Sequence, residues 1–75
     1  MGKFSGITYR VLSKRLREFG FMFFRAAKGS HEIWYCRETD RYTTIPRHRG
    51  DMAEGTLRQI LRQAGIEADD FFSDK

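Results

Sequence analysis

The chain has 75 residues, of which 40% are apolar and 15% aromatic, which suits one packed domain over residues 1–75 rather than a disordered tail. Cys36 is the single cysteine, so an internal disulfide is excluded, and one cysteine with two histidines lacks the spacing of a zinc site. No apolar run is long enough to span a bilayer. We therefore expect a cytoplasmic protein that uses no metal and no other cofactor.

The net charge of +4 is unevenly distributed along the chain. Residues 1–50 hold eleven Lys and Arg against four acids, whereas five of the ten acids follow residue 53, most of them in a short acidic C-terminal tail. A basic field of this kind suits a polyanionic partner, and nucleic acid is the commonest one. Many soluble domains of similar charge bind no nucleic acid, so charge alone does not settle the partner.

A first helix is expected after Thr8, a typical N-cap residue, and Gly20 occupies the position of a left-handed C-terminal cap. One apolar stripe runs along this helix: Val11, Leu12, Leu16 and Phe19. Three strands are predicted next, at 21–26, 30–37 and 42–45. Their short connections, Lys28-Gly29 and 38–40, predict an antiparallel meander, which ends at the only proline, Pro46.

A second helix is predicted to begin between Asp51 and Glu54. Asp51 with Glu54 three residues later would form a capping box, but Gly55 would then fall in the first turns, so a start nearer Glu54 is equally consistent. The buried stripe of this helix has helical spacing: Leu57, Ile60, Leu61 and Ala64. Gly65 closes the helix, and residues 66–72 are expected to form a half-turn or a short helix.

The order helix, three strands, helix predicts an α+β fold. Two amphipathic helices can cover one face of a three-stranded antiparallel sheet and leave the other face open to solvent. This is the layout of the double-stranded-RNA-binding-domain fold.

Five short motifs add a more specific signal than this layout. In chain order they are Gly20-Phe21, Lys28-Gly29-Ser30-His31, Trp34, the run 45–50 (IPRHRG) and the run 55–66 (GTLRQILRQAGI). Together they resemble the HicA/YcfA-like toxins over roughly residues 5–66. The first strand looks about one residue longer before the Gly-Ser-His turn than in that family, and the segment before the first helix also looks longer.

The resemblance implies a ribosome-independent mRNA endonuclease (an mRNA interferase), the toxin of a type II toxin–antitoxin pair. It also implies a double-stranded-RNA-binding-domain-like fold and one histidine required for cleavage, which maps onto His31. A HicB-like antitoxin would bind the toxin and cover His31, and the free toxin is expected to be monomeric.

The chemistry of RNA explains how one histidine could be enough. RNA carries its own nucleophile, the 2′-hydroxyl, and a histidine of ordinary pKa can take or give a proton at neutral pH. The tight turn at Gly29 would present the His31 ring at the sheet surface. Ser30 could orient the ring or the phosphate, and Lys28 could stabilise the phosphorane charge. The alternative is a His31 that only packs or caps a strand, and the second acid–base partner stays open among His48, Tyr35 and water.

Strand alternation places His31, Ile33, Tyr35 and Arg37 on one face and Ser30, Glu32, Trp34 and Cys36 on the other. If Trp34 belongs to the core, His31 lies on the open face with Tyr35. There Tyr35 could stack an unpaired base or could simply pack across strands.

Other basic residues are candidates for RNA binding. Arg47, His48 and Arg49 form a compact cationic loop suited to phosphates, or alternatively a solvated loop. Arg58 and Arg62 line one side of the second helix, although Glu54 four residues before Arg58 could satisfy part of that charge.

Two other functions compete with the nuclease. One is an RNA-binding module without chemistry, which needs no histidine after a glycine turn. The other is an interaction domain whose open sheet face exists to bind an antitoxin chain.

Overall fold

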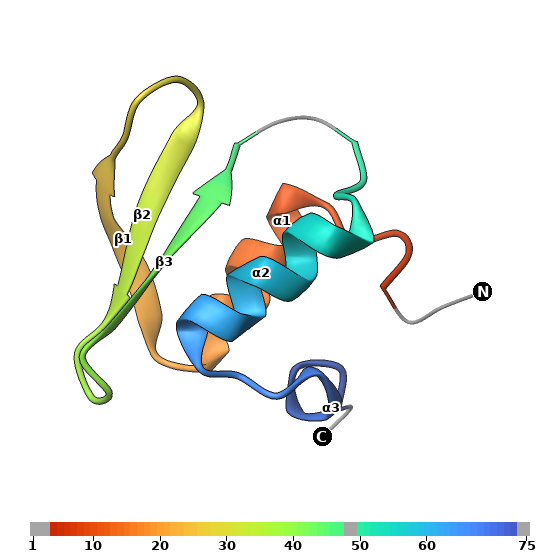
Figure 1. Cartoon of the computed structure of the whole chain (residues 1–75). Coiled ribbons are helices and arrows are strands. Elements are labelled where there is room, and N and C mark those ends of the chain that lie inside the picture. The colour runs from red at the N-terminus through yellow and green to blue at the C-terminus, as the bar shows by residue number, and fades with distance from the viewer. Residues whose placement is uncertain (1–3, 48–49, 74–75) are drawn as a thin grey trace.

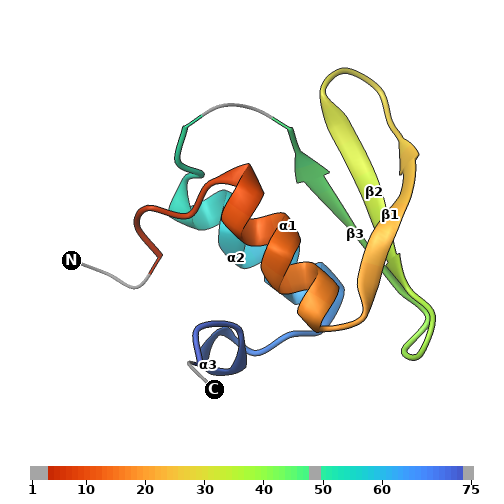
Figure 2. The same cartoon turned by 180° about the vertical axis from the view of Figure 1, so that it is seen from behind.

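The computed structural model describes residues 4–47 and 50–73. In chain order the elements are α1 (Tyr9–Glu18), β1 (Phe21–Ala26), β2 (His31–Cys36), β3 (Arg41–Pro46), α2 (Glu54–Ala64) and α3 (Ala68–Phe71). The strands form one antiparallel sheet in the order β1-β2-β3. Figure 1 shows α1 and α2 together on one side of this sheet, and the reverse view in Figure 2 shows the same arrangement from behind. The predicted α+β layout is confirmed.

Helix α1 begins where the sequence predicts. The Thr8 hydroxyl accepts a hydrogen bond from the Val11 backbone N–H at 3.3 Å, as an N-cap does. Leu12 and Leu16 are fully buried, but Val11 is 38% exposed, so its place in the buried stripe is wrong. Successive residues lie about 100° apart around a helix, and this puts Val11 at the margin of the stripe that Leu12 and Leu16 occupy.

The β1–β2 pairing contains an irregularity that the sequence analysis did not predict. Phe23 pairs with Trp34, but the register then shifts, so that Arg25 pairs with Ile33 and Phe24 lies in a β-bulge. A bulge places one additional residue on one strand of a pair. Phe24 is that residue on β1.

Helix α2 begins at Glu54, so the later of the two predicted starts is correct and the capping box is wrong. The N-cap is Ala53, with no side-chain hydrogen bond. Asp51 instead pairs with Thr8 in an isolated antiparallel bridge, which aligns the segment before α1 with the segment before α2. The predicted apolar stripe of α2 is buried, and Gly65 ends the helix in the left-handed conformation (φ 72°).

Hydrogen bonds between β3 and α2 hold the helix over the β3 edge of the sheet. The Thr43 hydroxyl donates to the Ile60 carbonyl at 2.9 Å, and the Thr44 backbone N–H donates to the Gln63 side-chain oxygen at 3.0 Å. The second of these bonds satisfies a backbone donor of an edge strand. The position of α2 relative to β3 is therefore fixed by specific contacts.

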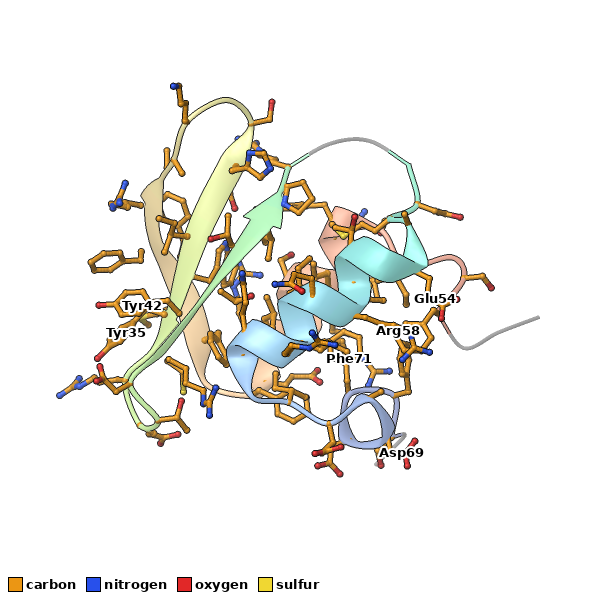
Figure 3. All side chains as sticks on the ribbon, viewed as in Figure 1. Tyr35, Tyr42, Glu54, Arg58, Asp69 and Phe71 are labelled. Carbon is orange, nitrogen blue, oxygen red and sulfur yellow. The ribbon has the colours of Figure 1, made fainter. Side chains whose placement is uncertain are left out.

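Helix α3 completes the core beneath α1. Phe71 is 1% exposed and stacks on Phe19 at a centroid distance of 6.4 Å, while the Arg15 guanidinium donates to the Phe71 carbonyl at 2.9 Å. Phe71 lies below α2 in Figure 3. The acidic tail thus begins with an ordered helix. Within residues 4–47 and 50–73 no helix is long and apolar enough to cross a bilayer.

Candidate functional site

Strand β2 divides its side chains between two faces, as the alternation predicts. Glu32, Trp34 and Cys36 are buried on the face covered by the helices, which we call the inner face. His31 is exposed and Tyr35 is half-buried on the opposite, outer face. The sequence predicts that His31 lies on the open face if Trp34 belongs to the core. Trp34 is only 1% exposed, so this condition is met.

The turn before β2 sets the orientation of the His31 ring. Gly29 has φ +70°, a left-handed conformation that glycine adopts without strain, and the Ala27 N–H donates to the His31 carbonyl at 2.8 Å. The Nδ1 atom of His31 lies 3.3 Å from the Lys28 carbonyl oxygen. A carbonyl only accepts hydrogen bonds, so this contact favours the tautomer with its proton on Nδ1. That tautomer leaves Nε2 of His31 able to accept a proton.

His31 lies at the border of two surface hollows. The first lies between the end of β3 and the first half of α2, and its lining consists of His31, Thr44, Pro46, Gly55, Thr56, Gln59 and Ile60. The second lies at the start of β2, and its lining consists of Ala26, Gly29, Ser30, His31, Glu32 and Arg47. His31 is common to both, so a strand of substrate that follows either hollow passes its ring.

Glu32 is a polar residue of this site that the sequence reasoning missed. Its side chain is buried, and one carboxylate oxygen accepts hydrogen bonds from the Tyr9 hydroxyl at 2.8 Å and the Trp34 indole N–H at 3.0 Å. Burial and the bond to Glu32 raise the pKa of Tyr9 above its usual value. The signal was present: a carboxylate at a position that alternation assigns to the core requires partners.

Arg47 is brought to His31's end of the sheet. Its backbone N–H donates to the Ser30 carbonyl at 2.7 Å, and its exposed side chain reaches Glu32, with Nε 3.9 Å from Oε2. Arg47 is therefore beside both Ser30 and the second hollow. The other two residues of the predicted cationic loop, His48 and Arg49, lie outside the described residues.

Tyr35 is engaged at the opposite end of β2 from His31. Its hydroxyl donates to the Asp40 carboxylate at 3.0 Å, and this bond raises the pKa of Tyr35 above its usual value. Tyr35 is four positions along the strand from His31, a rise of about 13 Å. The structure therefore does not bring the Tyr35 hydroxyl to the imidazole.

Arg58 and Arg62 are also apart from His31. Arg58 pairs with Glu54, as the spacing predicts, at 2.8 Å, and its guanidinium lies 4.3 Å from the centre of the Phe4 ring. Figure 3 shows Arg58 and Glu54 side by side. Arg58 and Arg62 share a different hollow with Arg41, and neither arginine lines the two hollows at His31.

In the part of the chain that the structure describes, no group of three or more His, Cys, Asp or Glu side chains could hold a metal ion. Cys36 is 1% exposed and acts as a small core residue, with its thiol directed at the Phe19 carbonyl at 3.8 Å.

A comparison with models of known protein families finds a match that covers most of the chain. A family model described as the HicA toxin of bacterial toxin-antitoxin matches residues 9–66, from the start of α1 to just beyond α2. A comparison with curated proteins finds no match. The matched span includes the whole sheet, both long helices and the turn that carries His31. The family implies a cognate antitoxin as partner. The chain belongs to the HicA family of toxins from toxin–antitoxin systems.

Proposed function

We propose that this toxin, as one domain over residues 1–75, is a metal-independent endoribonuclease that cuts mRNA in the cytoplasm without the ribosome, with His31 as its catalytic residue. The observation that carries the proposal is the state of the imidazole. The ring is exposed at the border of two hollows, and its Nδ1 is engaged by the Lys28 carbonyl at 3.3 Å. Nε2 is thereby the ring atom suited to take up a proton.

The reaction would use the nucleophile that RNA supplies. Nε2 of His31 accepts the proton of a ribose 2′-hydroxyl, the 2′-oxygen attacks the adjacent phosphorus, and the bond from phosphorus to the 5′-oxygen breaks. The leaving 5′-oxygen takes a proton, so the products are a 2′,3′-cyclic phosphate and a 5′-hydroxyl. DNA, which has no 2′-hydroxyl, would not be cut.

Charge that develops on the phosphorane requires nearby donors. Lys28 and Ser30 belong to the turn that carries His31, and Arg47 lines the same hollow as Ser30 and His31. Cations and hydroxyls aimed at developing charge are the usual means of stabilising such a transition state. We assign Lys28, Ser30 and Arg47 to this role and Arg49 to further phosphate binding, with Arg58 and Arg62 as outer contacts to the RNA backbone.

The proton for the leaving oxygen needs a source besides the base. Tyr35 is held by Asp40 at the far end of β2, so it is the weakest of the three candidates. His48 or a water molecule remains for this step. Glu32 serves a different purpose, since one of its carboxylate oxygens accepts hydrogen bonds from Tyr9 and Trp34 and the other faces the Arg47 side chain.

The antitoxin would act by occlusion. We propose that the free toxin is a monomer and that a HicB-like antitoxin covers His31. The support is the exposure of His31 on the open outer face, where a partner chain can reach the ring without displacing a helix. A non-catalytic RNA-binding module is the competing function, but a histidine with one nitrogen oriented by a backbone carbonyl favours proton transfer over simple binding.

The test is a cleavage assay in EDTA on single-stranded RNA. A second substrate has the same sequence with 2′-deoxyriboses, and His31→Gln, which keeps a polar side chain but cannot exchange a proton near neutral pH, is the matched variant. We expect the wild type to cut the RNA, to leave cyclic phosphate ends and to spare the deoxy substrate. Cleavage by His31→Gln at the wild-type rate, or cleavage that EDTA abolishes, would contradict the proposal.

A further inference from the structure

The outer face of the sheet carries three aromatic rings in mutual contact, which we call the aromatic shelf: Phe24, Tyr35 and Tyr42. Their ring centroids are 4.6 to 5.9 Å apart, with the Tyr35–Tyr42 pair the closest. Figure 3 shows Tyr35 and Tyr42 pointing away from the helices, into solvent. The rings form one continuous surface at the end of β2 away from His31.

The shelf is built by the register of the sheet. Tyr35 and Tyr42 are direct cross-strand partners, and the bulge in β1 brings Phe24 against both rings. Phe24 is 52% exposed and Tyr42 is 49% exposed, so burial in the free protein does not account for their presence. Exposed aromatic clusters of this kind mark sites of interaction.

Positive charge borders the shelf. Arg25 follows Phe24 directly and pairs with Ile33 on the outer face, and Arg37 is close enough to Tyr35 for its charge to oppose the upward shift of the Tyr35 pKa. Both arginines are exposed. Aromatic rings interleaved with cations are the pattern by which proteins hold single-stranded nucleic acid, since rings stack bases and arginines contact phosphates.

We infer that the aromatic shelf is a subsite that stacks unpaired bases of the substrate, and that RNA lies along the outer face from the shelf to His31. The inference rests on the proposed function and adds a base-stacking subsite, which requires that the RNA be unpaired there. The rise of about 13 Å from Tyr35 to His31 places the stacked base away from the scissile bond. Bases of a duplex are stacked and paired within the helix, so paired RNA cannot offer their faces to the shelf.

The experiment measures RNA affinity by fluorescence anisotropy in a His31→Ala background, in which the probe stays intact. One probe is a single-stranded RNA of mixed sequence, and the other is the same strand annealed to its complement. We expect the unpaired probe to bind more tightly. Loss of a stacking ring in Phe24→Ala should weaken its binding by about 5-fold or more.

The neighbouring phenylalanine provides a matched control. Phe23 is as exposed as Phe24, at 51%, but it pairs with Trp34 and makes an edge contact with that ring, outside the shelf. We expect Phe23→Ala to keep the affinity of its background. Tyr42→Phe, which retains the ring, should also bind normally, whereas Phe24→Leu, which retains apolar area without a ring face, should bind weakly.

Each other result overturns the inference. Equal affinity of Phe24→Ala and its background would exclude stacking on the shelf, while cleavage by the wild type and inactivity of His31→Gln would leave the proposed function standing. Normal binding by Phe24→Leu would show that apolar area alone suffices, as for a protein partner seated there. Absence of both RNA binding and cleavage in the wild type would overturn the proposed function and the shelf together.

Discussion

The two faces of the sheet differ in how their polar and aromatic groups are used. On the inner face, Trp34 is buried and its indole N–H is bonded to Glu32, which also accepts from Tyr9. On the outer face, the Tyr42 ring is half exposed and His31 is exposed. The inner face holds the fold together, and the outer face is left with side chains that the fold does not need.

The contrast between the two faces shows how so small a chain separates stability from function. The hydrophobic core lies on one side of the sheet only, between the sheet and its helices. Substitutions on the two faces of the sheet should therefore affect different properties. Inner-face changes should lower the free energy of unfolding, and outer-face changes should lower RNA cleavage or binding.

The largest effect is expected from Trp34→Ala. Removal of a fully buried indole should cost about 3–5 kcal/mol of unfolding free energy, because it leaves a cavity and deprives Glu32 of a donor. Urea denaturation followed by circular dichroism measures this loss. Tyr42→Ala on the outer face of the same sheet is the control and should cost less than about 1 kcal/mol. Similar losses in both variants would remove the distinction between the faces.

Gly29→Ala tests the turn that orients His31. The left-handed conformation of Gly29 costs a residue with a side chain about 1 kcal/mol, although an added Cβ would meet only the His31 Nδ1 at 3.9 Å. Gly6 has φ +77° and open space around it, so Gly6→Ala should lose similar stability. Only Gly29→Ala should also slow RNA cleavage. Equal cleavage rates in the two variants would show that the conformation of the Gly29 turn does not affect cleavage.

Tyr9→Phe tests the hydrogen bonds beneath the site. Loss of the bond to Glu32 should cost about 1 kcal/mol near neutral pH. The pKa of Tyr9 is raised in the folded state, so this stabilisation is present below the ordinary tyrosine pKa and is lost as pH rises through the folded value. Unfolding free energies measured from neutral to alkaline pH should therefore fall less steeply for Tyr9→Phe. A decline parallel to that of the wild type would contradict this assignment.

Gly55→Ala is expected to have the smallest effect on stability, with the opposite sign. Gly55 lies in the first turn of α2, and an added Cβ would meet nothing within 4 Å. Alanine favours a helix, so unfolding free energy should rise by about 0.5 kcal/mol. The same methyl group narrows the hollow that His31 borders, so cleavage should slow. Faster or unchanged cleavage would show that RNA does not use this hollow.

The sequence predicted most of what periodicity and local chemistry control. Alternation along β2 placed His31 opposite Trp34, and helical spacing identified the buried stripe of α2. Tertiary pairing overrode local signals elsewhere: Asp51 has the residue type of a cap, yet it bridges to Thr8 and leaves Ala53 as the N-cap.

The sequence predicts only part of the candidate site, because the positions of its other residues depend on the register in which the strands pair. The position of Phe24 on the shelf follows from a bulge that no local pattern specifies. The pairing of Arg47 with Ser30 and Glu32 depends on how β3 aligns with β2. Residues that share a helix face, such as Arg58 and Arg62, were visible in the sequence, but their distance from His31 was not.

The most direct test of the two-face account measures His31→Ala in two assays at once, RNA cleavage in EDTA and unfolding in urea. His31 is exposed and its ring contacts only the Lys28 carbonyl among the hydrogen-bond partners that the structure describes. The account predicts loss of cleavage with an unfolding midpoint close to that of the wild type. Retained cleavage, or loss of cleavage together with a large drop in stability, would contradict it.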